Sequence, residues 1–150
     1  MRRLKRLALG AGLFALAAAG ACTKAESSPA APAATGVNVA GAWRGTASDS
    51  SGPGSITLQV TQSGTDLTGS VNMSVTTVTG RGTLTGTVTG TGIRLTIAIP
   101  AGGFDAPFAS CTASVSGSGQ ASASSITLTY TGTNSCSGPI TKGELTLSKG

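Results

Sequence analysis

The sequence predicts an all-β domain, built as a small antiparallel up-and-down barrel of about eight strands. After residue 38, apolar and polar side chains alternate along successive short segments, as in Ile56–Val60 and Ile93–Ile99. A period of two places one set of side chains inward and the other outward. Clusters of glycine, proline, serine and aspartate separate these segments, as is typical of turns. No segment after residue 38 has the spacing of an amphipathic helix.

The turn signals divide the domain into its expected strands. These are residues 40–48, 54–62, 66–75, 78–89, 92–99, 107–117, 122–132 and 140–148. Short connections favour a meander, and such a meander usually closes into a barrel because closure removes exposed strand edges. A flattened two-sheet sandwich is the alternative. Because the inward positions are mostly Val, Leu, Ile, Ala and Gly, we expect a narrow, filled interior.

The amino-terminal segment has the parts of a secretory signal. Residues 1–21 begin with four basic side chains and continue with an uncharged apolar run that ends in small residues, the pattern of a signal peptide. The apolar run is shorter than the roughly 20 residues that cross a bilayer as a helix. We therefore expect a cleaved signal peptide, with an uncleaved anchor as the alternative.

The end of this segment, Ala19-Gly20-Ala21-Cys22, resembles the lipobox of bacterial lipoproteins, in which small residues precede an invariant cysteine. The resemblance implies cleavage before Cys22 and acylation of its sulfur and new amino group, which would anchor the protein to a membrane of the cell envelope, at the outer membrane or the cell surface. Ala19 stands where the lipobox usually has Leu. The same residues also suit the ordinary signal peptidase, so a secreted or periplasmic form without lipid is the alternative.

The charge of the chain changes sharply between its parts. The formal net charge is +5, but four of the ten basic residues lie within the first six positions. Residues 22–150 hold six basic and five acidic residues, a net charge of +1. Nucleic-acid binding needs a clustered basic face, usually with aromatic side chains for stacking, so it is not expected. Residues 22–38, rich in Pro, Ala and Ser, are expected to be a flexible linker to a domain over 39–150.

Residues with catalytic chemistry are scarce. The chain has no histidine, which removes the commonest general base and metal ligand. It has no paired carboxylates, G-x-S-x-G, P-loop or C-x-x-C motif, which are signatures of common enzyme and cofactor sites. We expect no catalytic residue, no metal site and no cofactor, and hence a protein that is not an enzyme.

Cys111 and Cys136 remain as a pair once Cys22 is assigned to lipidation. They flank a predicted hairpin whose turn lies near residues 119–123. A register in which paired residue numbers sum to 247 sets the two cysteines opposite each other and Val115 opposite Gly132. We predict a cross-strand disulfide, as suits an oxidising compartment; two buried free thiols are the alternative.

Gly41-Ala42-Trp43 opens the first expected strand and holds the only tryptophan. A G-x-W motif on the first strand of an eight-stranded meander resembles the calycin superfamily of lipocalins and avidins. The resemblance implies a carrier of a small apolar ligand, with Trp43 as a candidate site residue and a basic residue of the last strand, Lys142 or Lys149, over its ring. Avidins use several tryptophans for biotin, so biotin binding is not expected. Small periplasmic inhibitors of lysozymes and proteases are similar in overall architecture, since they too have a signal peptide, a small barrel and one disulfide.

The longest expected loop contains Phe104 and Phe108. Loops commonly carry function, and exposed aromatic side chains anchor interfaces; plugging of an open barrel end is the alternative role. Our leading hypothesis is a non-enzymatic envelope lipoprotein that binds a protein partner through these loops, with inhibition of that partner as one form of the hypothesis. The alternatives are a calycin-like carrier of a small apolar ligand and a structural surface protein without a specific ligand.

Overall fold

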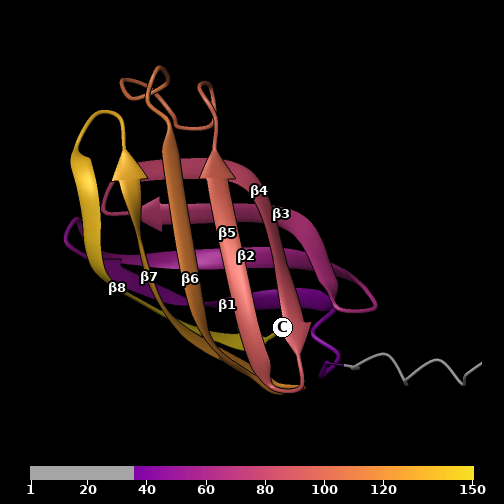
Figure 1. Cartoon of the computed structure of the whole chain (residues 1–150). Coiled ribbons are helices and arrows are strands. Elements are labelled where there is room, and N and C mark those ends of the chain that lie inside the picture. Colours follow the sequence, from indigo (N-terminus) through magenta and orange to yellow (C-terminus); the bar gives the residue numbers. More distant parts are fainter. Residues whose placement is uncertain (1–35) are drawn as a thin grey trace, which may run out of the picture. The chain divides into compact units, whose positions relative to one another are not determined.

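The computed structural model describes residues 36–150, which form one closed barrel of eight antiparallel strands (Figure 1). The predicted signal peptide, Cys22 and most of the predicted linker lie outside the described residues. The strands are β1 (Gly41–Asp49), β2 (Gly52–Ser63), β3 (Asp66–Val75), β4 (Val78–Thr89), β5 (Gly92–Ile99), β6 (Ala113–Ala121), β7 (Ser125–Asn134) and β8 (Gly138–Lys149).

Each strand pairs with the next along the chain, and β8 closes the barrel by pairing with β1 from Trp43↔Lys149 to Ser48↔Glu144. The predicted all-β, up-and-down barrel is therefore confirmed, and the two-sheet sandwich is not formed. In this part of the chain, no helix has the length and apolar character needed to cross a membrane.

The alternation of the sequence becomes the inside and outside of the barrel. On β5, for example, Ile93, Leu95, Ile97 and Ile99 are buried and the residues between them are exposed. Every buried residue in the range 36–150 is apolar or glycine. Threonine and serine fill the outward positions, where β-branched side chains suit a strand and the hydroxyls face water.

One strand was predicted in the wrong place. The expected strand 107–117 is observed as β6 at Ala113–Ala121, because residues 100–112 form a loop that folds back on β4. Within this loop, Arg81 N donates to Gly103 O at 2.7 Å, and Asp105 N donates to Thr79 O at 3.2 Å. The loop thus pairs with the end of β4 that extends beyond β5.

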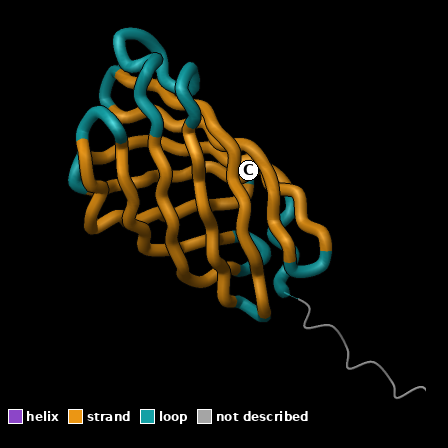
Figure 2. Tube along the Cα trace, turned by 45° about the horizontal axis from the view of Figure 1, so that its top comes forward, coloured by secondary structure: helices purple, strands orange, loops and turns teal. Residues whose placement is uncertain are grey.

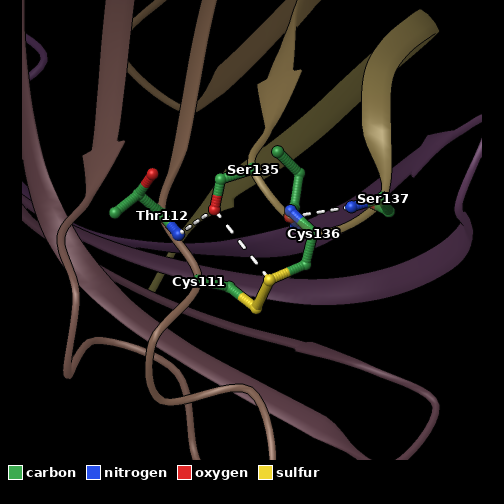
Figure 3. Close-up of a disulfide and its surroundings, with 6 residues drawn as sticks. Cys111, Thr112, Ser135, Cys136 and Ser137 are labelled. Carbon is green, nitrogen blue, oxygen red and sulfur yellow. Dashed lines mark hydrogen bonds between the residues drawn. A yellow bond between two sulfur atoms is a disulfide. The ribbon is translucent and has the colours of Figure 1, made fainter.

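The predicted hairpin register and disulfide are both confirmed. β6 and β7 pair Val115 with Gly132 and Gly119 with Leu128. The Cys111–Cys136 disulfide lies just beyond the paired strands, with 5.6 Å between the Cα atoms (Figure 3). Beside it, Thr112 N donates to Ser135 Oγ at 2.9 Å. These links join the loop 100–112 to the β7–β8 turn.

The loops gather at two ends of the barrel (Figure 2). We call one the closed end: it carries residues 36–40 and the turns 64–65, 90–91 and 122–124. We call the other the open end: it carries the loop 100–112 and the turns 50–51, 76–77 and 135–137.

The closed end is covered by the segment that leads into β1. Val37 N donates to Gly90 O at 2.8 Å, and Val39 N donates to Gln62 Oε1 at 2.8 Å. Val39 and Trp43 have no exposed surface, and Trp43 Nε1 donates to Val39 O at 2.8 Å. Val37 therefore already contacts the barrel, although it lies within the segment expected to be linker.

Candidate functional site

The open end of the barrel contains a cavity of about 360 Å³. All eight strands and the loop 100–112 contribute to its wall, and most of the contributing side chains are apolar. The expectation of a filled interior is therefore wrong at this end. The inward residues here include Ala47, Ala113 and Gly117, which are too small to fill a barrel whose width is fixed by its number of strands.

The wall residues divide into a deep set and a rim. Those reaching deepest are mostly Ile and Leu, and they come from β2, β5, β7 and β8: Ile56, Leu95, Ile97, Leu128 and Leu145. The rim comes from the open-end turns and includes Ser51, Thr76 and Ser137. An apolar interior with a few polar groups at the entrance is the usual composition of a small-molecule site.

The two candidate phenylalanines occupy different environments. Phe104 is only 7% exposed and lies in the cavity wall, where its backbone forms a bridge with Gly80. A Cβ atom at Gly80 would lie 2.9 Å from Phe104 Cε1, so the glycine makes room for the ring. Phe104 therefore closes part of the barrel end, as the alternative interpretation expected.

Phe108 lies at the entrance to the cavity and is 41% exposed. It is the large apolar side chain that residues 36–150 leave exposed. Two backbone hydrogen bonds fix its place in the loop: Phe108 N donates to Asp105 O, and Cys111 N donates to Phe108 O, each at 2.9 Å. The disulfide at Cys111 then holds the same loop against the β7–β8 turn.

Asp49 and Tyr130 form a polar pair in the cavity wall. The Tyr130 hydroxyl donates to Asp49 Oδ2 at 2.8 Å, and Ser51 N donates to Asp49 Oδ1 at 2.7 Å. Burial of the ring, followed by the hydrogen bond and the negative charge of Asp49, raises the pKa of the Tyr130 hydroxyl. Tyr130 therefore remains a hydrogen-bond donor to the carboxylate across the physiological pH range.

A β-bulge on β8 lies beside Tyr130. The register between β7 and β8 shifts between Tyr130 and Gly132, and Lys142 on β8 adopts a φ of 55°. The extra residue on β8 allows both Ile140 and Leu145 to face inward despite their opposite parity. It also places Gly143 beneath the Tyr130 ring, where a Cβ atom would collide with the ring. Bulges commonly re-aim side chains beside sites.

Trp43 lies away from the cavity, in the packed core of the closed end. Lys142 and Lys149 were the two candidates for a basic residue over the Trp43 ring, and it is Lys149 that lies there. Its Nζ is 5.4 Å from the ring centroid, within the range of a cation–π contact. The structure thus brings Phe104 and Phe108 together at one end of the barrel and places Trp43 at the other.

Sequence reasoning missed Asp49 and Tyr130 as site residues. Asp49 lies next to a turn, where an aspartate usually caps its own backbone, and it does accept such a bond from Ser51. The alternation along β1 could have indicated that Asp49 faces inward, because it continues the inward series Trp43, Gly45 and Ala47. Within residues 36–150, no three His, Cys, Asp or Glu side chains are grouped as metal ligands would be.

Comparison of the chain with protein-family models, with curated proteins and with solved structures gives no match. Function is therefore inferred from the residues and geometry of the barrel.

Proposed function

We propose that the chain is an exported envelope protein whose barrel binds a small apolar molecule in the open-end cavity. The cavity carries this proposal: its volume of about 360 Å³ lies within the range of about 300–1,000 Å³ typical of small-molecule sites. This is the carrier function that the sequence offered as an alternative to protein binding. The position of Lys149 over Trp43 supports the resemblance to calycins from which that alternative came. No catalytic step is part of the proposal.

The entrance to the cavity supports the proposal because it is fixed before any ligand arrives. The loop 100–112 is tied to β4 by the hydrogen bonds of Gly103 and Asp105, and to the β7–β8 turn by the disulfide. The Thr79 hydroxyl also donates to the Asp105 carboxylate. A site that is already shaped loses little conformational entropy when it binds, which favours affinity.

The proposal can be tested with N-phenyl-1-naphthylamine, an uncharged apolar dye whose fluorescence rises in apolar surroundings. We expect the mature protein to take up the dye saturably. Ala113→Phe places a large ring inside the cavity and should weaken uptake by roughly tenfold or more, equivalent to about 1.4 kcal/mol. Ser114→Phe, the matched control, adds the same ring at the neighbouring exposed position on β6 and should leave uptake unchanged. Absence of saturable uptake by the unsubstituted protein would contradict the proposal.

The place of the protein in the cell is proposed from its sequence. We propose that acyl chains on Cys22 hold the domain at the envelope membrane, which is the expected membrane partner. Mass spectrometry of protein extracted from its own cells should show a chain that begins at Cys22 and carries acyl groups. Cys22→Ser should lack that mass and move the protein from the membrane to the soluble fraction. Recovery of an unacylated chain beginning at Cys22 would support the secreted alternative.

A second candidate function is the binding of a protein partner through the open-end loop. The observation that favours it is the exposed ring of Phe108. Phe104 is buried, so its substitution would disturb the barrel end and cannot report on surface contacts alone. Phe108→Ser should abolish recovery of a specific partner in pull-downs if this function operates, whereas Phe108→Leu should retain much of it. Equal recovery with all three proteins would exclude Phe108 as the contact.

A further inference from the structure

The open-end cavity has one charged residue in its wall. Of the residues that line it, Asp49 alone is ionisable to a carboxylate, and neither Lys nor Arg is among them. An apolar cavity with a single fixed charge discriminates between ligands by their head groups, because the charge attracts one sign and repels the other in surroundings of low dielectric. We propose that the ligand is an apolar amine, whose ammonium group binds Asp49 while its hydrocarbon part fills the cavity. This inference rests on the proposed function.

The geometry of Asp49 leaves the carboxylate able to accept a further bond. Tyr130 OH and Ser51 N each donate one hydrogen bond to it, one to each oxygen. An ionised carboxylate has about four acceptor positions, so acceptor capacity remains on both oxygens. Because both donors are neutral groups, the negative charge of Asp49 is oriented by them and not cancelled.

Lys142 lies on β8, the strand that pairs with β1, but it does not line the cavity that contains Asp49. Lys142 follows Thr141, whose backbone is hydrogen-bonded to Ser50. However, Lys142 is exposed and lines a hollow on the outer surface of the barrel together with Thr129, Thr131 and Glu144. Glu144 is thus the carboxylate that shares the surroundings of Lys142, on the side of the sheet opposite to the cavity.

The charge of the whole domain gives no general attraction for cations. Residues 36–150 contain five basic side chains, Arg44, Arg81, Arg94, Lys142 and Lys149, and four acidic ones, Asp49, Asp66, Asp105 and Glu144. The net charge of these side chains is +1, so nonspecific attraction would slightly favour anions. A preference for an amine must therefore come from the local field of Asp49.

The test compares three ligands with the same alkyl chain: decylamine, decanol and decanoate. The affinity of each ligand is measured by its displacement of N-phenyl-1-naphthylamine from the mature protein. The quantity compared is the ratio of decylamine affinity to decanoate affinity. We expect the amine to bind more tightly by roughly tenfold or more. Asp49→Asn keeps the size of the side chain and one acceptor oxygen, which can still accept from Ser51 N, while its amide nitrogen can donate to the Tyr130 hydroxyl oxygen. Because it removes the charge, it should reduce the ratio to near one.

Asp66→Asn is the matched control, because it removes the same charge from an exposed position at the closed end and should leave the ratio as it is. If the dye binds but decanoate competes as well as decylamine, or if Asp49→Asn leaves the ratio unchanged, the amine inference is overturned and the proposed function stands. If neither the dye nor any of the three ligands is taken up, the proposed function and the inference both fail. Should Asp49→Asn not fold, Tyr130→Phe serves as the second variant. It removes one of the two neutral donors and leaves the charge of Asp49, so the ratio should be retained or should rise. A fall in the ratio would overturn the inference.

Discussion

The closed and open ends of the barrel are built from the same eight strands but from different side chains. At the closed end, Trp43 and Val39 have no exposed surface, and residues 36–40 lie across the opening. At the open end, the inward positions include alanine and glycine, and a cavity of about 360 Å³ remains. The comparison indicates that one end of the domain is filled by side chains and that the other leaves a cavity open.

The two ends also differ in which residue types adopt a positive φ. The turns 64–65 and 90–91 at the closed end use glycine where φ is positive, at Gly64 and Gly90. At the open end, Gly52, Gly102 and Gly138 also have positive φ. The two non-glycine residues with positive φ in the range 36–150 lie there as well: Thr76 in a turn, and Lys142 at the bulge beside Tyr130. Unfavourable backbone conformations concentrate at functional sites when the surrounding structure holds them.

The largest expected effect is at the closed end. Trp43→Ala removes the largest fully buried side chain and should lower the free energy of unfolding by about 3–5 kcal/mol. Urea unfolding followed by circular dichroism measures this loss. Phe108→Ala, at the exposed open-end position, is the control and should cost well under about 1 kcal/mol. A similar loss for the two variants would remove the distinction between a packing end and a binding end.

The disulfide gives the next largest effect. Replacing Cys111 and Cys136 together by alanine opens a loop with a sequence separation of 25 residues, which should lower the free energy of unfolding by about 3 kcal/mol. Amide hydrogen exchange should rise first in the loop 100–112, because the remaining ties of that loop are a few hydrogen bonds, to β4 and between Thr112 and Ser135. Faster exchange at the closed end before the loop would contradict this order.

One substitution made at both ends sharpens the comparison. Leu58 is fully buried opposite Trp43, whereas Leu128 lines the cavity. Leu58→Phe should overpack the closed end and cost about 1–3 kcal/mol. Leu128→Phe can extend into free volume and should cost less than about 1 kcal/mol, while weakening dye uptake. Equal costs, measured by urea unfolding, would show that the two ends are equally filled.

The smallest effect at neutral pH is that of the Tyr130 hydroxyl. Tyr130→Phe removes its hydrogen bond to Asp49 and should cost about 1 kcal/mol. Because the folded state raises the pKa of Tyr130 above the ordinary value of about 10, it holds the phenolic proton more tightly than the unfolded chain does. The stability from this difference is present below about pH 10 and is lost as the pH rises above it.

This pH dependence has a direct optical measurement. Tyr130 is the only tyrosine, so ultraviolet absorbance of the phenolate reports its ionisation alone. Ionisation should be delayed in the folded protein relative to the urea-unfolded chain. The alkaline loss of stability should be smaller in Tyr130→Phe than in the unsubstituted protein. Ionisation at the same pH in both states would contradict the buried hydrogen bond.

The sequence predicted the regular parts of this fold well, because alternation and turn residues act locally. The bounds of β3, β4 and β5 match the predicted segments, and so does the register that pairs Val115 with Gly132. The loop that contains Phe104 and Phe108 was expected, but its extension to residue 112 was missed, because its pairing with β4 joins residues distant in the chain. No local pattern indicates that Phe104 belongs to a barrel wall.

The cavity was missed for a different reason. Counting small inward residues suggested a filled interior, but the volume to be filled depends on strand number and tilt, which set the barrel width. Asp49 resembled an ordinary turn aspartate, although Asp49 and Tyr130 both follow the inward alternation of their own strands. The bulge at Lys142 was not foreseen either. A bulge shifts parity along one strand, and its position in β8 could not be read from the alternation alone.

The central claim, that the open end binds an apolar molecule, is tested most directly by nuclear magnetic resonance of the methyl-labelled mature protein with bound N-phenyl-1-naphthylamine. The account predicts intermolecular nuclear Overhauser contacts between the dye and methyl groups of the cavity wall, at Ile97, Leu128 and Leu145. It predicts no such contacts with the closed-end core at Leu58 or Val39. Contacts confined to the outer surface, or none at all under saturating dye, would contradict it.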